Sequence, residues 1–296
     1  MNFLDHIPTI LPLLLFLIML FMGMTLSVAD FRRVAIYPKA VVIGLLCQLV
    51  LLPIIAFGII KILPLEAVFA MGIMIVAASP GGAVSNLISH LSKADTALSI
   101  SLTAVSSVLT LFTIPLILNF SLLHLMDSGS VVIELPYGKT VFNIFKLTIL
   151  PVAIGMSVNH YFPKLTKTFL KAITWISVLI IILALILVYV KLDQIGDVPT
   201  YIRKCFLAVL ILNMATLGVG YFGARFSGIN RRQAVTISIE TGMQNNVLGM
   251  AIATAPSLLN NPLMAVPAGV YGLLMCTTAV IMILIFRKLI DAQNNV

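Results

Sequence analysis

Long apolar stretches constrain this chain more than any other feature. Each runs for about 20 residues and ends at a cluster of charge or at Pro and Gly, and they recur from one end of the chain to the other. Among the 296 residues 60% are hydrophobic and 9% are charged, whereas an ordinary soluble domain carries roughly 25% charged residues. The chain is therefore predicted to be an all-α integral membrane protein that is surrounded by a lipid bilayer.

Nine segments are long and apolar enough to form transmembrane helices. We place them at residues 7–27, 40–60, 67–91, 96–118, 141–160, 172–190, 205–224, 233–257 and 263–286. The first has no basic region before it and runs into a positive loop, so we interpret it as a retained span and not as a signal peptide. The connections are too short for a soluble domain, so residues 1–296 are expected to form a single transmembrane unit.

The net charge of +8 is distributed unevenly along the chain. If successive connections lie on alternate sides of the membrane, Lys146 falls within a span. Five basic residues then lie on one side, namely Lys61, Lys139, Lys191, Arg203 and Lys204. Twelve lie on the other side, namely Arg32, Arg33, Lys39, Lys93, Lys164, Lys167, Lys171, Arg225, Arg231, Arg232, Arg287 and Lys288. This bias predicts a multi-pass protein of the cell membrane, with its amino terminus outside and its carboxyl terminus in the cytoplasm. It argues against nucleic acid as a partner.

Glu240 is the one acidic residue among ten that falls inside an apolar stretch long enough to cross a bilayer. A carboxylate at that depth is costly unless it is paired, protonated or bound to a cation, so it marks a functional site by default. A structural ion pair with Lys146 is the simpler alternative, although we expect Lys146 to reach the outer interface. The residues that follow Glu240 are Thr, Gly, Met, Gln, Asn and Asn, where a lipid-facing helix would carry Leu and Val.

Two of the nine segments contain residues that interrupt helices. The third has Pro80, Gly81 and Gly82 near its middle, and the eighth has Gly242 within its polar run. Freed backbone groups are tolerated in hydrocarbon where protein or a water-filled cavity covers them, so both breaks are expected to face inward. The two segments are five spans apart and cross the membrane in opposite directions, as they would in an inverted-repeat transporter.

Oxygen-bearing side chains cluster around the two breaks and on the neighbouring segments. Hydroxyls, amides, carbonyls and a single carboxylate suit a hard cation better than a soft metal, and the low charge favours a monovalent ion over Ca²⁺. Sodium is our prediction, and the spacing alone also allows potassium, or a proton on Glu240. Two pairs, Ser99 with Thr103 and Glu240 with Gln244, are four residues apart and would each share a helical face.

Four motifs resemble those of the bile acid:sodium symporter family, in the same order and at similar separations. They are Gly23-Met24-Thr25-Leu26 through Asp30-Phe31, Pro80-Gly81-Gly82 through Ser85-Asn86, Ala97-Leu98-Ser99 through Thr103, and Glu240-Thr241-Gly242-Met243-Gln244-Asn245. The second and fourth together are specific, and the resemblance covers nearly the whole chain. We therefore identify the chain as a member of this family, of the bacterial type with nine transmembrane helices.

The resemblance implies two subdomains and two sodium sites. A panel subdomain would comprise spans 7–27, 141–160 and 172–190, and a core subdomain would comprise spans 40–60, 67–91, 96–118, 205–224, 233–257 and 263–286, with the two broken helices crossing inside the core. The first sodium site would use Ser85, Asn86, Ser99, Thr103 and Glu240. The second would use Gln48, Glu240, Gln244 and the backbone oxygens of Thr241 and Met243.

The function that the resemblance implies is sodium-coupled uptake of a small organic anion by alternating access. The anion would be bile-acid-like or another amphipathic carboxylate or sulfonate, because two sodium ions beside one carboxylate leave a surplus positive charge. We expect it to bind at Asn245, Asn246, Gly82 and Ala83. Met275 and Cys276 stand where some bacterial relatives carry a His-Asn pair, so we assign no particular substrate. The sequence indicates no oligomeric state.

Three other functions compete with this interpretation. A passive pore would show conductance without saturable, coupled uptake. A proton-coupled efflux carrier of the same superfamily, or one for metalloid oxyanions that depends on the thiol of Cys276, is a second possibility. An intramembrane enzyme is disfavoured, because the sequence offers no nucleophile and base at usable spacing.

Overall fold

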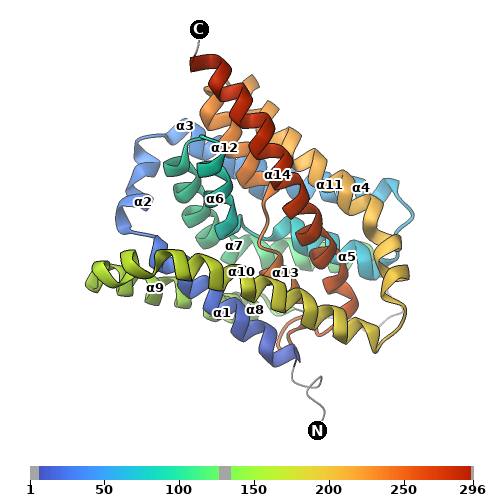
Figure 1. Ribbon diagram of the computed structural model, residues 1–296. Coiled ribbons are helices and arrows are strands. Elements are labelled where there is room, and N and C mark those ends of the chain that lie inside the picture. The colour runs from blue at the N-terminus through green and yellow to red at the C-terminus, as the bar shows by residue number, and fades with distance from the viewer. Residues whose placement is uncertain (1–6, 127–134, 295–296) are drawn as a thin grey trace.

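The computed structural model describes residues 7–126 and 135–294, and each regular element within them is a helix (Figure 1). The first half contains α1 (Ile7–Thr25), α2 (Val28–Arg32), the 3-10 turn η2 (Arg33–Ala35), α3 (Pro38–Leu46), the π-helical turn η3 (Cys47–Leu51), α4 (Leu52–Ile62), α5 (Ala67–Ala78), α6 (Ala83–Leu91) and α7 (Thr96–Leu125). The second half contains α8 (Tyr137–Leu147), α9 (Ile149–Tyr161), α10 (Pro163–Asp193), α11 (Val198–Phe226), α12 (Arg231–Gly242), α13 (Asn246–Thr254), the 3-10 turn η4 (Pro262–Ala265) and α14 (Val266–Asn294). The predicted all-helical class is confirmed.

Six helical stretches in the described residues are long and apolar enough to cross a membrane. They are Pro38–Ile62, Thr96–Leu125, Tyr137–Tyr161, Trp175–Asp193, Val198–Phe226 and Pro262–Lys288. The pair formed by α1 and α2, which bends by 75°, would make a seventh. The predicted third and eighth segments are not in this set, because each consists of two short helices on either side of a break. The total of nine spans therefore stays a prediction.

The long helices extend beyond the apolar segments that predicted them. α7 continues from residue 118 to Leu125, and α10 begins at Pro163 instead of residue 172. An apolar window ends where the chain reaches polar surroundings, whereas helical hydrogen bonding continues until a cap or a breaker stops it. At the start of α7 the side chain of Asp95 accepts a hydrogen bond from the backbone N–H of Leu98, and a proline occupies the first turn of α10.

α1 packs against α9 and α10, and these helices lie together in the lower part of Figure 1. Glycines allow the close approach of α1 and α9. A Cβ added at Gly23 would lie within 3.0 Å of the backbone of Val152, and one added at Gly155 would lie within 3.0 Å of the backbone of Leu20. Small residues of this kind let helix backbones come into contact inside a membrane. These two helices therefore form one closely packed pair.

The broken helices lie in the centre of the molecule. Every residue from 69 to 82 and from 234 to 255 is buried, including both breaks. Both breaks therefore face inward, as the sequence predicted. On the outside, by contrast, large apolar side chains such as Ile54, Leu179 and Leu284 are about 60% exposed, at 60%, 62% and 62%. Such a surface is suited to hydrocarbon and not to water.

Candidate functional site

The two breaks lie against each other in antiparallel pairing at the centre of the fold. The backbone N–H of Gly82 donates to the carbonyl of Met243 at 2.9 Å, and the N–H of Asn245 donates to the carbonyl of Pro80 at 2.9 Å. The residues between these two bonds form an antiparallel bridge. Backbone groups that the interrupted helices release are thus satisfied by the other break, which is what a low-dielectric interior requires.

Glu240 lies in the last turn of α12, next to this pairing, and is 2% exposed. One carboxylate oxygen, Oε2, accepts a hydrogen bond from the Ser99 hydroxyl at 2.9 Å, and the other, Oε1, accepts one from the Thr103 hydroxyl. Gly81 leaves room for the carboxylate, because a Cβ at that position would lie within 3.0 Å of Oε1. The carboxylate thus points at the first break and at α7.

Hydroxyls surround the Glu240 carboxylate, whereas Asp30 and Glu66 each lie beside a basic side chain. Glu66, for example, lies 2.6 Å from the ammonium group of Lys204. Lys146, the alternative partner considered above, is exposed on α8, and its Nζ lies 4.8 Å from the centroid of the Phe142 ring. The structure therefore gives no support to an ion pair between Glu240 and Lys146.

The five residues predicted for the first sodium site form one hydrogen-bonded cluster. The Ser99 hydroxyl lies 2.9 Å from Oδ1 of Asn86 as well as 2.9 Å from Glu240. The Ser85 hydroxyl lies 3.4 Å from that of Thr103, but it donates its proton to a backbone carbonyl at 2.7 Å. Since a hydroxyl carries one proton, Ser99 cannot satisfy both of its acceptors at once. Acceptor oxygens therefore outnumber the hydroxyl protons in this cluster.

Two of the residues predicted for the second sodium site, Gln48 and Gln244, present unpartnered oxygens near Glu240. Nε2 of Gln48 donates to the carbonyl of Glu240 at 3.4 Å, and Nε2 of Gln244 donates to the carbonyl of Thr241 at 2.7 Å. Both amides use their nitrogen in this way, and Oε1 of each is buried without a hydrogen-bond partner. Buried acceptors of this kind need an explanation, and a bound ion is one.

Gln48 reaches this place through a local distortion that the sequence analysis missed. It lies in the π-helical turn η3, where the N–H of Leu52 donates to the carbonyl of Cys47, five residues earlier. Pro53 follows directly and has no N–H to donate to the carbonyl of Leu49, which favours this irregular turn. Such turns are frequent at functional sites. The Pro at position 53 was the available signal.

The predicted shared helical face of Glu240 and Gln244 is wrong. α12 ends at Gly242, so Gln244 is part of the extended break and not of the helix. Its side chain reaches the region of Glu240 because it folds back onto the carbonyl of Thr241. Ser99 and Thr103 do share a helical face as their spacing predicts, since both lie within α7 and both donate to the same carboxylate.

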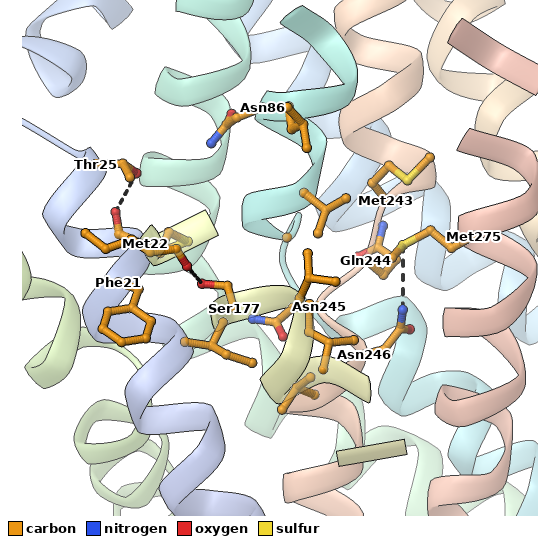
Figure 2. Close-up of a pocket in the computed structure, with 18 of the residues that line it drawn as sticks. Phe21, Met22, Thr25, Asn86, Ser177, Met243, Gln244, Asn245, Asn246 and Met275 are labelled. Carbon is orange, nitrogen blue, oxygen red and sulfur yellow. Dashed lines mark hydrogen bonds between the residues drawn. The ribbon is translucent and has the colours of Figure 1, made fainter. Parts of the chain in front are cut away.

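A cavity of about 320 Å³ lies beside the paired breaks. α1 and α10 line one side of it, and α6, the second break and α14 line the other. Figure 2 shows Phe21 and Met22 of α1 on one side and Asn245 of the second break opposite them. The lining side chains are all neutral and mostly apolar. Six of them are polar, namely Thr25, Asn86, Ser177, Gln244, Asn245 and Asn246.

The two asparagines predicted to bind substrate both line this cavity. Oδ1 of Asn245 accepts the N–H of Leu248 at 3.0 Å and so caps α13, a role that the sequence analysis missed. Nδ2 of Asn245 lies 3.9 Å from the sulfur of Met19, and Nδ2 of Asn246 lies 3.6 Å from that of Met275. A thioether is a weak acceptor, so a stronger acceptor would readily replace it at both amides.

The remaining predicted residues occupy less informative positions. Gly82 lines the cavity, and Ala83 is the first residue of α6. Met243 also lines it, and its carbonyl is used in the pairing of the breaks. Cys276 is exposed on α14, while its neighbour Met275 lines the cavity. The alternative that depends on this thiol therefore gains no support from the geometry.

Comparison of the sequence with known proteins identifies the family. A sequence model of the Sodium Bile acid symporter family matches residues 12–196, more than half of the protein. The chain belongs to this family. The matched stretch contains every predicted sodium ligand up to Thr103 and ends before Glu240. The family is one of transporters and not of enzymes.

Several similar proteins have names that state a transported ion or metabolite. The chain is 32% identical over 257 residues to a probable chloroplastic sodium/metabolite cotransporter, BASS2, of Oryza sativa subsp. japonica, covering 86% of this chain and 58% of that protein. It is 29% identical over 269 residues to the uncharacterized sodium-dependent transporter YocS of Bacillus subtilis, covering 90% and 79%. It is 31% identical over 245 residues to the human ileal sodium/bile acid cotransporter, covering 82% and 68%. The chain thus spans less than two thirds of the plant protein.

Proposed function

We propose that this family member is a sodium-coupled secondary active transporter for a small organic anion. One observation carries the proposal: a buried carboxylate, that of Glu240, lies where two interrupted helices meet and is held by the hydroxyls of Ser99 and Thr103. An ionised group at that depth is stable when a cation accompanies it. The printed names of the similar proteins, which combine sodium with a metabolite or a bile acid, support the same conclusion.

Two sodium ions would bind, one on each side of Glu240. The first would take the excess acceptor oxygens of Ser85, Asn86, Ser99 and Thr103 together with the carboxylate. The second would take the unpartnered Oε1 atoms of Gln48 and Gln244, with the carboxylate and the backbone oxygens of Thr241 and Met243. Hydroxyl, amide and carbonyl oxygens are hard ligands, and one shared carboxylate suits monovalent ions.

The substrate would be an amphipathic carboxylate or sulfonate bound in the cavity beside the breaks. Its anionic head would replace the two thioethers as acceptor for the amide nitrogens of Asn245 and Asn246. α6 and α13 both begin at the breaks. The amino-terminal end of a helix carries a partial positive charge, which would stabilise the anionic head. Its apolar part would lie against residues such as Ile18, Phe21 and Ile181.

The transporter would have nine spans if each broken helix is counted as one. It would lie in the cell membrane with its amino terminus outside. α1, α8, α9 and α10 would belong to the panel, and the remaining spans would form the core. Because the cavity lies between α1 and α10 on one side and the breaks on the other, movement of the core against the panel would open and close it. It reaches Thr25, at the end of α1 that this orientation places toward the cytoplasm.

The charge balance sets the driving force. Two sodium ions with one monovalent anion would carry one net positive charge inward in each cycle. The membrane potential then contributes about 2.3 kcal/mol per 100 mV in addition to the sodium gradient. Sodium would also order the two breaks before the anion binds, because the amides that hold the anion belong to the same segments as the sodium ligands.

The test measures whether sodium binds and whether Glu240 is required. The purified protein is melted in sodium chloride and in choline chloride, with and without candidate anions, because a ligand that binds the folded state raises its apparent stability. Sodium is expected to stabilise the wild type and the Glu66→Gln control but not Glu240→Gln. The acid of Glu66 is exposed, and it precedes α5, whose other end leads into the first break. Equal melting temperatures in both salts for the wild type would refute sodium coupling, as would anion uptake that persists when choline replaces sodium.

A further inference from the structure

A buried hydroxyl behind the second break has no part in either proposed sodium site. Tyr271 of α14 is 0% exposed, and its hydroxyl donates to the carbonyl of Gly242 at 2.9 Å. Its oxygen lies 3.3 Å from the hydroxyl of Thr216 on α11, and the amide of Asn213, one turn earlier, lies beside it. A buried tyrosine hydroxyl normally finds a hydrogen-bond partner, and here the acceptor is a backbone carbonyl of the second break.

The peptide unit between Gly242 and Met243 is held from both ends. The Tyr271 hydroxyl binds its carbonyl oxygen, and its N–H, which belongs to Met243, donates to the carbonyl of Ile239 at 2.9 Å. Gly242 faces the Leu217 side chain of α11 closely, because a Cβ at this position would lie within 3.0 Å of it. The orientation of this peptide plane is therefore fixed by α12 and by Tyr271.

The carbonyls on either side of this peptide are two proposed ligands of the second sodium ion. Met243 has φ −107° and ψ 88°. These angles are of similar size and opposite sign, as they are in a strand, so the carbonyls of Gly242 and Met243 point in roughly opposite directions. The Gly242 carbonyl points toward Tyr271, because it accepts a hydrogen bond from the Tyr271 hydroxyl. The carbonyl of Met243 therefore points away from Tyr271, toward the first break, where the N–H of Gly82 donates to it at 2.9 Å.

We propose that Tyr271 is a positioning residue for the second sodium site, acting through the Gly242 carbonyl on the carbonyls of Thr241 and Met243. The hydroxyl touches neither ion nor substrate. Without it, the Gly242 carbonyl would be a buried acceptor with no donor and would rotate to compete for the amide nitrogen of Gln244 or for the sodium ion itself. The inference rests on the proposed function, because it assumes that sodium binds at this break.

The experiment titrates sodium against the melting temperature of purified wild type, Tyr271→Phe and Tyr201→Phe. The matched control removes an exposed tyrosine hydroxyl that also donates to a carbonyl, that of Ile195 at 3.4 Å, away from the breaks. Tyr271→Phe is expected to raise the sodium concentration for half-maximal stabilisation about tenfold, equivalent to ~1.4 kcal/mol. Tyr201→Phe should leave it unchanged. If Tyr271→Phe does not fold, Thr216→Val, which removes the neighbouring hydroxyl, replaces it with an expected increase of at least twofold.

The outcomes separate this inference from the proposed function. A wild type whose melting temperature does not respond to sodium refutes the proposed function and the inference together. The inference alone is refuted if the wild type responds to sodium and Tyr271→Phe melts lower by the same amount in sodium and in choline. The hydroxyl would then support the fold without orienting the site. A larger half-maximal concentration in Tyr271→Phe, with the control at the wild-type value, supports it.

Discussion

Replacing Gly81 by alanine tests how closely the first break approaches the carboxylate. The added Cβ would lie within 3.0 Å of Oε1 of Glu240, 3.1 Å from its Cδ and 3.2 Å from Nε2 of Gln48, whereas ordinary contacts begin near 3.4 Å. The pairing of the breaks holds the Gly81 backbone in place. The carboxylate must therefore retreat by about 1 Å, which breaks its hydrogen bond with Thr103.

The expected loss follows from that displacement. A hydrogen bond to a charged group is worth about 1.5–3 kcal/mol, and the carboxylate is shared by both proposed sodium sites. We therefore expect sodium affinity to fall at least tenfold, or about 1.4 kcal/mol. At a sodium concentration 100 times the wild-type dissociation constant, sodium stabilises the protein by about 2.7 kcal/mol, and a tenfold weaker variant would keep about 1.4 kcal/mol.

Thermal melting of the purified variant in sodium chloride and in choline chloride measures this difference. Gly58→Ala is the matched control, because a Cβ at Gly58, inside α4, meets nothing within 4 Å. The control is expected to show the full sodium effect. The reasoning is refuted if Gly81→Ala folds and is stabilised by sodium as strongly as the control, since the carboxylate would then have moved without consequence or would not be a ligand.

Three further changes probe other parts of the molecule. Gln48→Leu removes a buried unpartnered oxygen together with a long hydrogen bond, 3.4 Å, to the carbonyl of Glu240, so stability in choline should change little. The slope of the sodium titration should drop from about two ions to about one. Asn246→Leu should abolish stabilisation by organic anions in sodium and keep the effect of sodium itself, as a melting screen would detect. Gly155→Ala places a Cβ within 3.0 Å of the Leu20 backbone and should lower stability by about 1–3 kcal/mol in either salt, whereas Gly218→Ala, which meets nothing within 4 Å, should not.

The features that the sequence predicted depend on local chemistry. Pro80 and Gly81 both weaken a helix, and the structure has its first break there. Ser99 and Thr103 share a face because their spacing matches the helical repeat, and both reach one carboxylate. The burial of Glu240 also followed, since an acid in an apolar stretch has to be covered by protein.

The features that the sequence did not reveal depend on contacts between distant residues. Gln48 meets the carbonyl of Glu240 across a separation of 192 residues, and no spacing rule relates the two positions. The end of α12 at Gly242 removed Gln244 from the helical face that its spacing suggested. Tyr271 resembles any aromatic side chain of an apolar helix, and its hydroxyl gains a role when α14 packs against the second break.

The antiparallel pairing of the two breaks also limits how this protein can vary. Because side chains alternate along extended backbone, one residue added to or removed from either segment would turn the rest of that short segment to the opposite face and rotate the helix that follows it. The register that sets Gly81 against Gln244 would be lost at the same time. Residues 79–82 and 243–245 should therefore be the least tolerant of insertions and deletions in the whole chain, even where single substitutions are accepted.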